Sequence, residues 1–247
     1  MIYASPYPKV RLGKNNDGGY VVALLPGGYD LFLSGGISND ISFETAILEL
    51  YPELTGVAFD GTIANIPIPE QLADRLTFVR KNLSNINSEQ TTNLDTYLAQ
   101  YNNIFMKLDI EGGEYPLLNS IANLANIKQL VIEFHNIKKS RAIMRRLSQT
   151  HYLIHLHPNN SLDYKFIQGI KVPKVFECTY VRKDLFNIIP PPRNKETIPT
   201  NLDQPNHLRR PDIKLFKWPY VKKRANYTKK RGSTLRTSIS SRRRKKK

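Results

Sequence analysis

Acidic residues crowd the segment 104–114, which reads IFMKLDIEGGE and begins as an apolar, strand-like run. Asp109, Glu111 and Glu114 fall within six residues. Carboxylates this close repel one another unless a cation, a substrate amine or hydrogen-bond donors accompany them, so we interpret all three as candidate catalytic residues. The alternative is that Glu111 and Glu114 only cap the helix that follows.

A histidine and a further acid end the apolar run QLVIEFH, where His135 follows Glu133 by two positions. A histidine at the carboxyl end of a strand, beside carboxylates, suits general-base catalysis, although most isolated histidines have a structural role. Carboxylates also suit hard divalent cations. The residues therefore predict proton transfer by His135 or by one of the acids, and a divalent metal is an open alternative.

Small residues follow the apolar run LFLS and lead into a helical pattern. Gly35, Gly36, Ser38 and Asp40 let a ligand lie against bare backbone at a helix N-terminus, as in nucleotide-binding α/β folds. A tight turn without a ligand is the alternative. Asp60 closes the next strand about twenty residues later, where doubly wound folds place the acid that binds a ribose. These five residues are the predicted cofactor-binding residues.

Short apolar runs rich in β-branched residues alternate with segments of helical period, which is typical of a mostly parallel sheet flanked by helices. The pattern predicts strands at 30–36, 55–61, 76–81, 104–111, 129–135, 152–157 and 175–181. It predicts helices at 41–51, 94–101, 116–124 and 139–148. The link 158–173 has no helical pattern, so the last two strands should be antiparallel neighbours.

The formal net charge of +16 belongs to the C-terminal part of the chain. Residues 205–247 hold 17 of the 37 basic and one of the 21 acidic side chains, which leaves 20 of each sign in residues 1–204. Seven prolines interrupt residues 190–219. We therefore expect one folded domain over 1–189, a Pro-rich linker over 190–219 and a disordered basic tail over 220–247.

The basic tail suits binding of a polyanion or a nucleic acid, and equally a solubilising or nuclear-addressing role. The single cysteine, Cys178, excludes a disulfide framework and a cysteine-based zinc site. The first twenty residues do not resemble a signal peptide, and nowhere do about 18 apolar residues run together. The expectation is an intracellular protein, cytoplasmic or nuclear, with no membrane span.

Taken together, the motifs resemble the FkbM-like methyltransferases. The segments that carry the resemblance are RLGKNNDGGYVV, SGGISNDISFE, VAFDGT, FMKLDIEGGEYPLL and VIEFH, and HLHPNNS and VFECTYVRKDL are similar to the end of one branch of that family. The resemblance spans residues 11–184. It implies a class I, Rossmann-like, doubly wound α/β fold with a mostly parallel seven-stranded sheet and an antiparallel last strand. It also implies S-adenosylmethionine as the methyl donor.

The resemblance implies roles for the predicted residues. Gly36 and Asp40 would border the methionine part of the cofactor, Asp60 would hold its ribose, and residues 109–114 would face the site of methyl transfer. Ser38 departs from the family, which usually has a second glycine there. The implied reaction is O-methylation of a glycan or small-molecule hydroxyl. The rivals are a nucleic-acid-binding protein that has lost activity and a nucleic-acid methyltransferase directed by the basic tail.

Two further segments have both a structural and a functional interpretation. Residues 17–20, Asp-Gly-Gly-Tyr, predict a turn before a short strand, and their recurrence in the resembled family allows a part in closing the cofactor pocket. His157, Asn159 and Asn160 precede a loop at the same face, where they could contact the acceptor or only pin the loop through side-chain hydrogen bonds.

Overall fold

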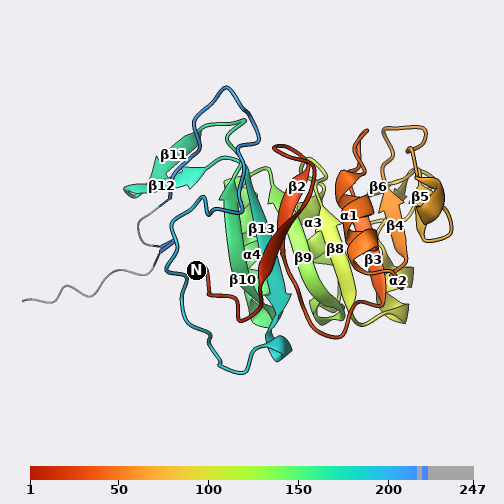
Figure 1. Ribbon diagram of the computed structural model, residues 1–247, viewed down its shortest axis with the longest axis horizontal. Coiled ribbons are helices and arrows are strands. Elements are labelled where there is room, and N and C mark those ends of the chain that lie inside the picture. The colour runs from red at the N-terminus through yellow and green to blue at the C-terminus, as the bar shows by residue number, and fades with distance from the viewer. Residues whose placement is uncertain (216–218, 222–247) are drawn as a thin grey trace, which may run out of the picture.

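The computed structural model describes residues 1–215 and 219–221. Its main feature is a seven-stranded sheet in the order β10-β13-β9-β8-β3-β4-β5 (Figure 1). The strands are β3 (Leu31–Gly35), β4 (Gly56–Phe59), β5 (Leu76–Val79), β8 (Ile104–Leu108), β9 (Ile127–Phe134), β10 (His151–Pro158) and β13 (Phe176–Arg182). Strand β13 is antiparallel to β9 and to β10, and the other pairs are parallel. The predicted fold class is confirmed.

The central strands are mostly apolar, as expected where both faces of the sheet are covered, although β8 contains Lys107 and β9 contains Gln129 and Glu133. In β3, Leu31 and Leu33 belong to one core cluster and Phe32 to the other, as expected when successive side chains point to opposite faces. Helices cover one face and a helix with a hairpin covers the other. A continuous apolar run is the pattern that a strand buried on both faces requires.

Four α-helices flank the sheet, close to the predicted ranges. They are α1 (Ser42–Leu50), α2 (Asp95–Gln100), α3 (Glu114–Ser120) and α4 (Ile137–Thr150). Helices α2, α3 and α4 pack into the larger core cluster on one face, and α1 packs on the other with the antiparallel hairpin of β1 (Lys9–Gly13) and β2 (Gly19–Ala23) (Figure 1). The turn predicted at residues 17–20 lies directly before β2 and starts this hairpin's second strand.

The link 158–173, which the sequence left without an element, forms a hairpin of β11 (Tyr164–Ile167) and β12 (Ile170–Pro173). The short strands β6 (Asn82–Leu83) and β7 (Thr91–Thr92) pair in parallel, and single 3-10 turns are η1 (Glu70–Leu72), η2 (Leu124–Asn126) and η3 (Lys183–Leu185). Among the described residues, every helix is too short or too polar to cross a membrane.

Residues 190–215 differ from the expected linker, because they pack against the sheet domain. Ile198, Ile213 and Leu215 are buried in the larger core cluster, and Ile198 and Leu215 form a β-bridge. Prolines prevent regular elements here, but a few buried side chains still attach the segment to the core. The expected disorder of residues 220–247 falls almost wholly outside the described residues, which include only 220 and 221 of that range.

Candidate active site

A cavity of about 770 Å³ opens where β3, β4 and β8 end. This volume is typical of small-molecule and cofactor sites, and the carboxyl edge of a parallel sheet is where doubly wound folds bind ligands. The cavity collects six of the nine predicted site residues: Gly36, Ser38, Asp40, Asp60, Asp109 and Glu111. The other three, Gly35, Glu114 and His135, do not line it.

The loop after β3 turns through left-handed backbone at Gly36, with φ 77°, and at Ser38, with φ 51°. A Cβ atom on Gly36 would lie 1.6 Å from the carbonyl oxygen of Asp109. Gly36 is therefore required by the approach of two backbones, a stricter reason than the room for a ligand that the sequence suggested. The positive φ of Ser38 explains why glycine is favoured there. Gly35 lies below the cavity, where a Cβ would meet Leu83.

Asp60 joins the loops after β3 and β4. Its Oδ2 accepts hydrogen bonds from the backbone N–H groups of Ile37 and Ser38 at 3.1 and 2.8 Å. Its Oδ1 accepts from the backbone and the hydroxyl of Thr62 at 2.8 and 2.6 Å. Burial raises the pKa of Asp60, but these hydrogen bonds outweigh it, so the pKa lies below its ordinary value. Asp60 is therefore a fixed negative charge at the end of the cavity formed by the loops after β3 and β4.

Asp40 closes the opposite wall. Its Oδ1 accepts from the backbone N–H of Ser42 at 3.0 Å, and its Oδ2 lies 2.8 Å from Nζ of Lys14, which comes from the turn before β2. Both Asp40 and Lys14 line the cavity. The ion pair therefore connects the β1–β2 turn to the start of α1 across the cavity mouth. The sequence did not indicate this contact, because Lys14 and Asp40 are far apart along the chain.

Glu44, on α1, is a buried acid that the sequence analysis did not single out. It is 1% exposed and lines the cavity. Its Oε1 accepts from the Ser34 hydroxyl at 2.5 Å, whereas Oε2 has no hydrogen-bond partner within residues 1–215 and 219–221. A buried carboxylate oxygen without a donor fits an ammonium group of a ligand, so this wall of the cavity suits a positively charged group.

Lys107 is a charged residue in the middle of the cavity floor. It is 5% exposed on β8, and its Nζ donates to the carbonyl oxygen of Gly36 at 2.5 Å. The same atom lies 5.6 Å from the centre of the Tyr20 ring. A lysine inside an otherwise apolar strand is unusual. This feature of the sequence could have identified Lys107 as part of the site.

At the other end of the cavity, His135 lies among carboxylates. Its Nε2 is 3.5 Å from Asp109 Oδ1, 3.4 Å from Glu111 Oε2 and 3.3 Å from Glu133 Oε1, and its Nδ1 is 3.3 Å from Glu114 Oε1. The four predicted catalytic residues therefore do meet, with Glu133 as a fifth member. The Tyr20 hydroxyl fixes Asp109 by donating to Oδ2 at 2.8 Å.

Glu114 differs from the others in this group because it is fully buried. Its two oxygens accept from the backbone N–H groups of His135 and Gly112 at 3.2 and 2.7 Å. Burial raises its pKa, but its bonds with His135 and the backbone lower the pKa below the ordinary value. Helix α3 begins after Gly113 without a side-chain cap, so capping does not explain the acids. Glu114 instead orients His135.

The protonation states of His135 and Glu133 are unusual. Burial lowers the pKa of His135, but hydrogen bonds and charge from Glu114 and Glu133 outweigh it and raise the pKa to about 10. Burial raises the pKa of Glu133 to about 7, with Asp109 adding to the rise and His135 opposing it. His135 is therefore protonated at neutral pH, and a protonated imidazole cannot accept a further proton as a general base.

A divalent cation is the other charge that this group could hold. In the described part of the chain, Asp109, Glu133 and His135 offer ligand atoms that all lie within 4.8 Å of one another. Two carboxylates and one imidazole form a ligand set suited to divalent metals. A proton on His135 satisfies the same carboxylates, so the geometry suits either.

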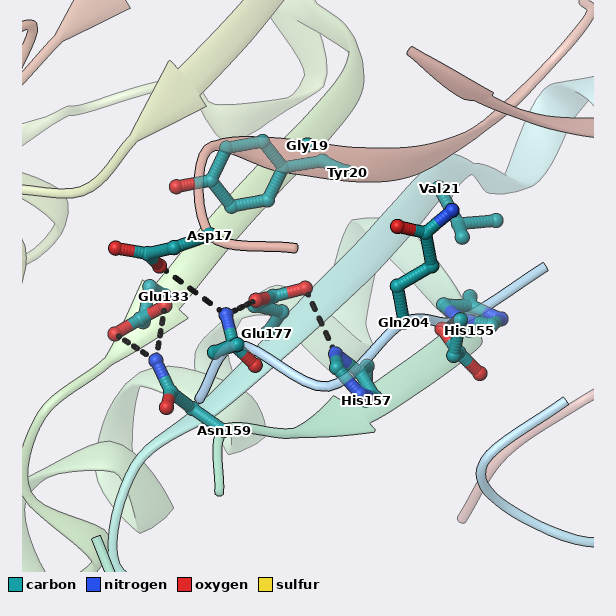
Figure 2. A network of polar contacts seen from close by, with 12 residues as sticks. Asp17, Gly19, Tyr20, Val21, Glu133, His155, His157, Asn159, Glu177 and Gln204 are labelled. Carbon is teal, nitrogen blue, oxygen red and sulfur yellow. Dashed lines mark hydrogen bonds and ion pairs between the residues drawn. The ribbon is translucent and has the colours of Figure 1, made fainter. Parts of the chain in front are cut away.

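Polar residues continue from Glu133 across the next two strands (Figure 2). Glu177 on β13 is the register partner of Glu133, and His157 on β10 lies 3.2 Å from Glu177. The side-chain amide of Asn159 donates to both oxygens of Glu133 at 3.3 Å, and its Oδ1 accepts from the backbone of Ser161. Asn159 therefore pins the loop after β10 to the acidic group.

The fold and the cavity define the class of protein. The sheet places its antiparallel strand second from one edge, and one cavity at the carboxyl edge is lined by Asp60 after β4 and by Asp109 and Glu111 after β8. This is the class I methyltransferase fold, in which a nucleotide-like cofactor lies across the ends of the parallel strands.

The family follows from comparison with known sequences. The profile of the Methyltransferase FkbM domain matches residues 4–165, well over half of the chain. The protein therefore belongs to the FkbM methyltransferase family, and S-adenosylmethionine is its cofactor. A comparison with curated protein sequences gave no match.

Solved structures of low sequence identity are also similar. The precorrin-6y C5,15-methyltransferase from Geobacter metallireducens GS-15 is 12% identical with a TM-score of 0.36, and the match covers 64% of this chain and 84% of that one. The C-terminal domain of the precorrin-6Y C5,15-methyltransferase from Rhodobacter capsulatus is 9% identical with a TM-score of 0.34, covering 65% and 83%.

Proposed function

We propose that the protein methylates a hydroxyl group of a glycan or a small molecule. The observation that carries this proposal is that the loop 36–40 and the acids Asp109 and Glu111 line one cavity. The bound cofactor supplies an electrophilic methyl group. The enzyme's main task is to align donor and acceptor for an in-line displacement, and a shared cavity supports that alignment.

The cofactor end of the cavity binds S-adenosylmethionine through its acids. Glu44 Oε2 receives the ammonium group, because it is buried and lacks a donor among the described residues. Asp60 binds the ribose. The Thr62 hydroxyl now donates to Asp60 Oδ1, and a hydroxyl can rotate to share that oxygen.

Asp109 accepts the proton of the acceptor hydroxyl. It lines the cavity, and the Tyr20 hydroxyl holds its carboxylate in place. His135 keeps its own proton at neutral pH because its pKa is about 10. Glu114 is enclosed by backbone donors. Among the four predicted catalytic residues, Asp109 and the neighbouring Glu111 are therefore the two that line the cavity and could take the proton there.

The acidic end of the cavity favours an uncharged acceptor. Asp109, Glu111, Glu114 and Glu133 all lie within 3.5 Å of His135, so the group is negative even with His135 protonated. Like charges repel phosphates and other anions. Sugar hydroxyls, in contrast, donate hydrogen bonds to carboxylates, which supports a glycan or a polyol.

A nucleic-acid acceptor is the second candidate, because residues 205–247 carry the whole net charge of +16. Such a segment binds polyanions with strong salt dependence. A chain ending at residue 221 separates the two candidates. If the tail delivers the enzyme to RNA or DNA, its removal lowers turnover on nucleic acid, and if the acceptor is a glycan, turnover is unchanged.

The decisive experiment incubates the protein with labelled S-adenosylmethionine and separate glycan, small-molecule and RNA extracts. We expect label in the glycan or small-molecule fraction, stable to mild alkali as an ether is and a methyl ester is not. Asp109→Asn serves as the control for transfer that does not use the site. Label in RNA alone, or in an alkali-labile product, would contradict the proposal.

A further inference from the structure

We propose that residues 203–206 form a clasp that holds in place the turn 15–17, of which Asp17 lines the cavity. Cofactor affinity then depends on a C-terminal segment that lies outside the matched family domain, residues 4–165. The inference rests on the use of S-adenosylmethionine at this cavity. Its residues are positioning residues, because they act through the turn.

The first half of the clasp consists of hydrogen bonds to the backbone and side chains of the turn. Gln204 Oε1 accepts from the backbone N–H of Asn16 at 2.9 Å, and Gln204 Nε2 donates to Asn15 Oδ1 at 3.2 Å. In return, Asn16 Nδ2 donates to the carbonyl oxygen of Pro205 at 3.0 Å. Two adjacent residues of the turn are thus hydrogen-bonded to two adjacent residues of the clasp. These bonds fix the position of the turn relative to the clasp.

The second half is one side-chain amide placed between two carboxylates. Asn206 Nδ2 donates to Glu177 Oε1 at 2.7 Å and to Asp17 Oδ1 at 3.3 Å. Asn206 is 9% exposed. Figure 2 shows Asp17 near Glu177, and each is joined by a dashed line to a hydrogen-bond partner. Because two carboxylates repel each other unless a donor stands between them, Asn206 keeps Asp17 close to strand β13.

The clasp is anchored independently of the turn. Asp203 Oδ1 lies 2.7 Å from Nε2 of His155 on β10, and both side chains are buried. Asp203 Oδ2 accepts from the backbone N–H of Thr200 at 2.6 Å. On the far side, Asn160 bonds to the backbone of His207 at 2.7 Å and 3.0 Å. The segment therefore holds its place on the sheet edge whether or not the turn is closed.

The turn matters because it belongs to the cavity wall. Asn16 has φ 67°, a left-handed conformation that asparagine adopts more readily than most non-glycine residues. Lys14, Asp17 and Tyr20 line the cavity. Without the clasp, the turn can relax, and the wall that includes the Lys14 to Asp40 ion pair opens.

Asn206→Ala tests the clasp, and Asn194→Ala is its matched control. Asn194 is 7% exposed, and within residues 1–215 and 219–221 its side chain hydrogen-bonds only with the backbone of Glu196. By calorimetry, we expect Asn206→Ala to weaken S-adenosylmethionine binding about tenfold, since a lost hydrogen bond to a charged group has this effect. The KM for the cofactor should rise with little change in kcat. Asn194→Ala should leave the affinity unchanged.

Asn206→Asp distinguishes the charge-separating role from simple packing, because the side chain keeps nearly the same volume. It places a third carboxylate between Asp17 and Glu177, so we expect a greater loss of affinity than in Asn206→Ala. Wild-type affinity in both variants would overturn the clasp, as would an equal loss in Asn194→Ala.

Hydrogen exchange separates the clasp from the cofactor assignment. The amides of residues 15–17 should exchange faster in Asn206→Ala than in the wild type and in Asn194→Ala. If wild-type protein bound no S-adenosylmethionine, the cofactor assignment would fail, and the exchange rates would still decide whether the clasp holds the turn. Unchanged exchange overturns the clasp.

Discussion

Asp60, which lines the cavity, and Glu133, in the acidic group beside it, have similarly low solvent exposures of 7% and 6%, yet their pKa values move in opposite directions. Asp60 accepts four hydrogen bonds from neutral donors, which outweigh its burial and lower its pKa. Glu133 lies beside Asp109 and Glu177, and burial raises its pKa to about 7.

Burial raises the pKa of both acids, and only at Asp60 do hydrogen bonds from neutral donors outweigh that effect. The cofactor end keeps a fixed charge and a fixed shape, because its hydrogen bonds join two loops. The acidic end exchanges protons near neutral pH, because its carboxylates share one imidazole. We therefore expect substitutions at the cofactor end to change folding and affinity, and substitutions at the acidic end to change turnover and pH dependence.

The largest effect is expected from Gly36→Ala. The new Cβ would lie 1.6 Å from the carbonyl oxygen of Asp109, so β3 and β8 must separate. We expect a loss of folding stability of about 3 kcal/mol or more in urea denaturation. Gly112→Ala is the control, because Gly112 has φ 101° but its Cβ would meet no atom within 4 Å in the described part of the chain. It should cost about 1 kcal/mol. If Gly36→Ala were as stable as the wild type, close approach of the two backbones would not be the reason for glycine at this position, and room for a ligand would again explain it.

The next largest effect is expected at the acidic end, from Asp109→Asn. An amide cannot accept the proton of the acceptor hydroxyl, so kcat should fall by about 10² to 10⁴, while calorimetry should find little change in cofactor affinity. Glu111→Gln is the control, because the Glu111 side chain is 84% exposed, and its kcat should fall less. A greater fall in Glu111→Gln than in Asp109→Asn would assign the proton transfer to Glu111.

The fold was predictable because each central strand is a continuous apolar run, and helical segments separate the parallel ones. The packing of residues 190–215 was not, because prolines remove periodicity while leaving single apolar residues such as Ile198 and Leu215 free to enter the core. Burial of isolated side chains leaves no repeating pattern in a sequence.

Residues that line the cavity were predictable where they come directly after a strand, as Gly36, Asp60 and Asp109 do. Residues that reach the cavity from elsewhere, such as Lys14 and Glu44, have no such signal, because their contacts depend on how distant segments cross. The cofactor and acceptor roles of the predicted residues stay proposals that the variants described here can test.

A smaller effect is expected from Asp60→Asn. The side chain keeps its shape, but its amide nitrogen would face N–H donors of Ile37 and Ser38 or of Thr62. We expect cofactor binding to weaken by about 1 to 3 kcal/mol, measured by calorimetry. Thr62→Val removes one donor and should weaken binding less. Equal affinity in Asp60→Asn and the wild type would remove Asp60 from the ribose site.

The smallest effect is a change in how stability depends on pH, and it concerns Glu133. Its pKa is 4.5 ordinarily and about 7 in the folded protein, so the folded state favours the protonated carboxyl. The stabilisation is complete below pH 4.5 and is lost as the pH rises through 7. His135 loses its own contribution at higher pH, as the pH rises from 6.5 through about 10, so the two windows can be separated. The pKa of about 7 already includes the opposing effect of His135, and we expect a loss of order 1 kcal/mol in urea unfolding between pH 4.5 and 7.

Glu133→Gln should flatten this part of the pH profile, because glutamine does not titrate and keeps the size of the side chain. Glu111→Gln is the control, since an 84% exposed carboxylate is screened by water and should leave the profile unchanged. A steeper fall in the control, or an unaltered slope in Glu133→Gln, would mean that another group binds the proton and that burial of Glu133 does not set the titration of the acidic end.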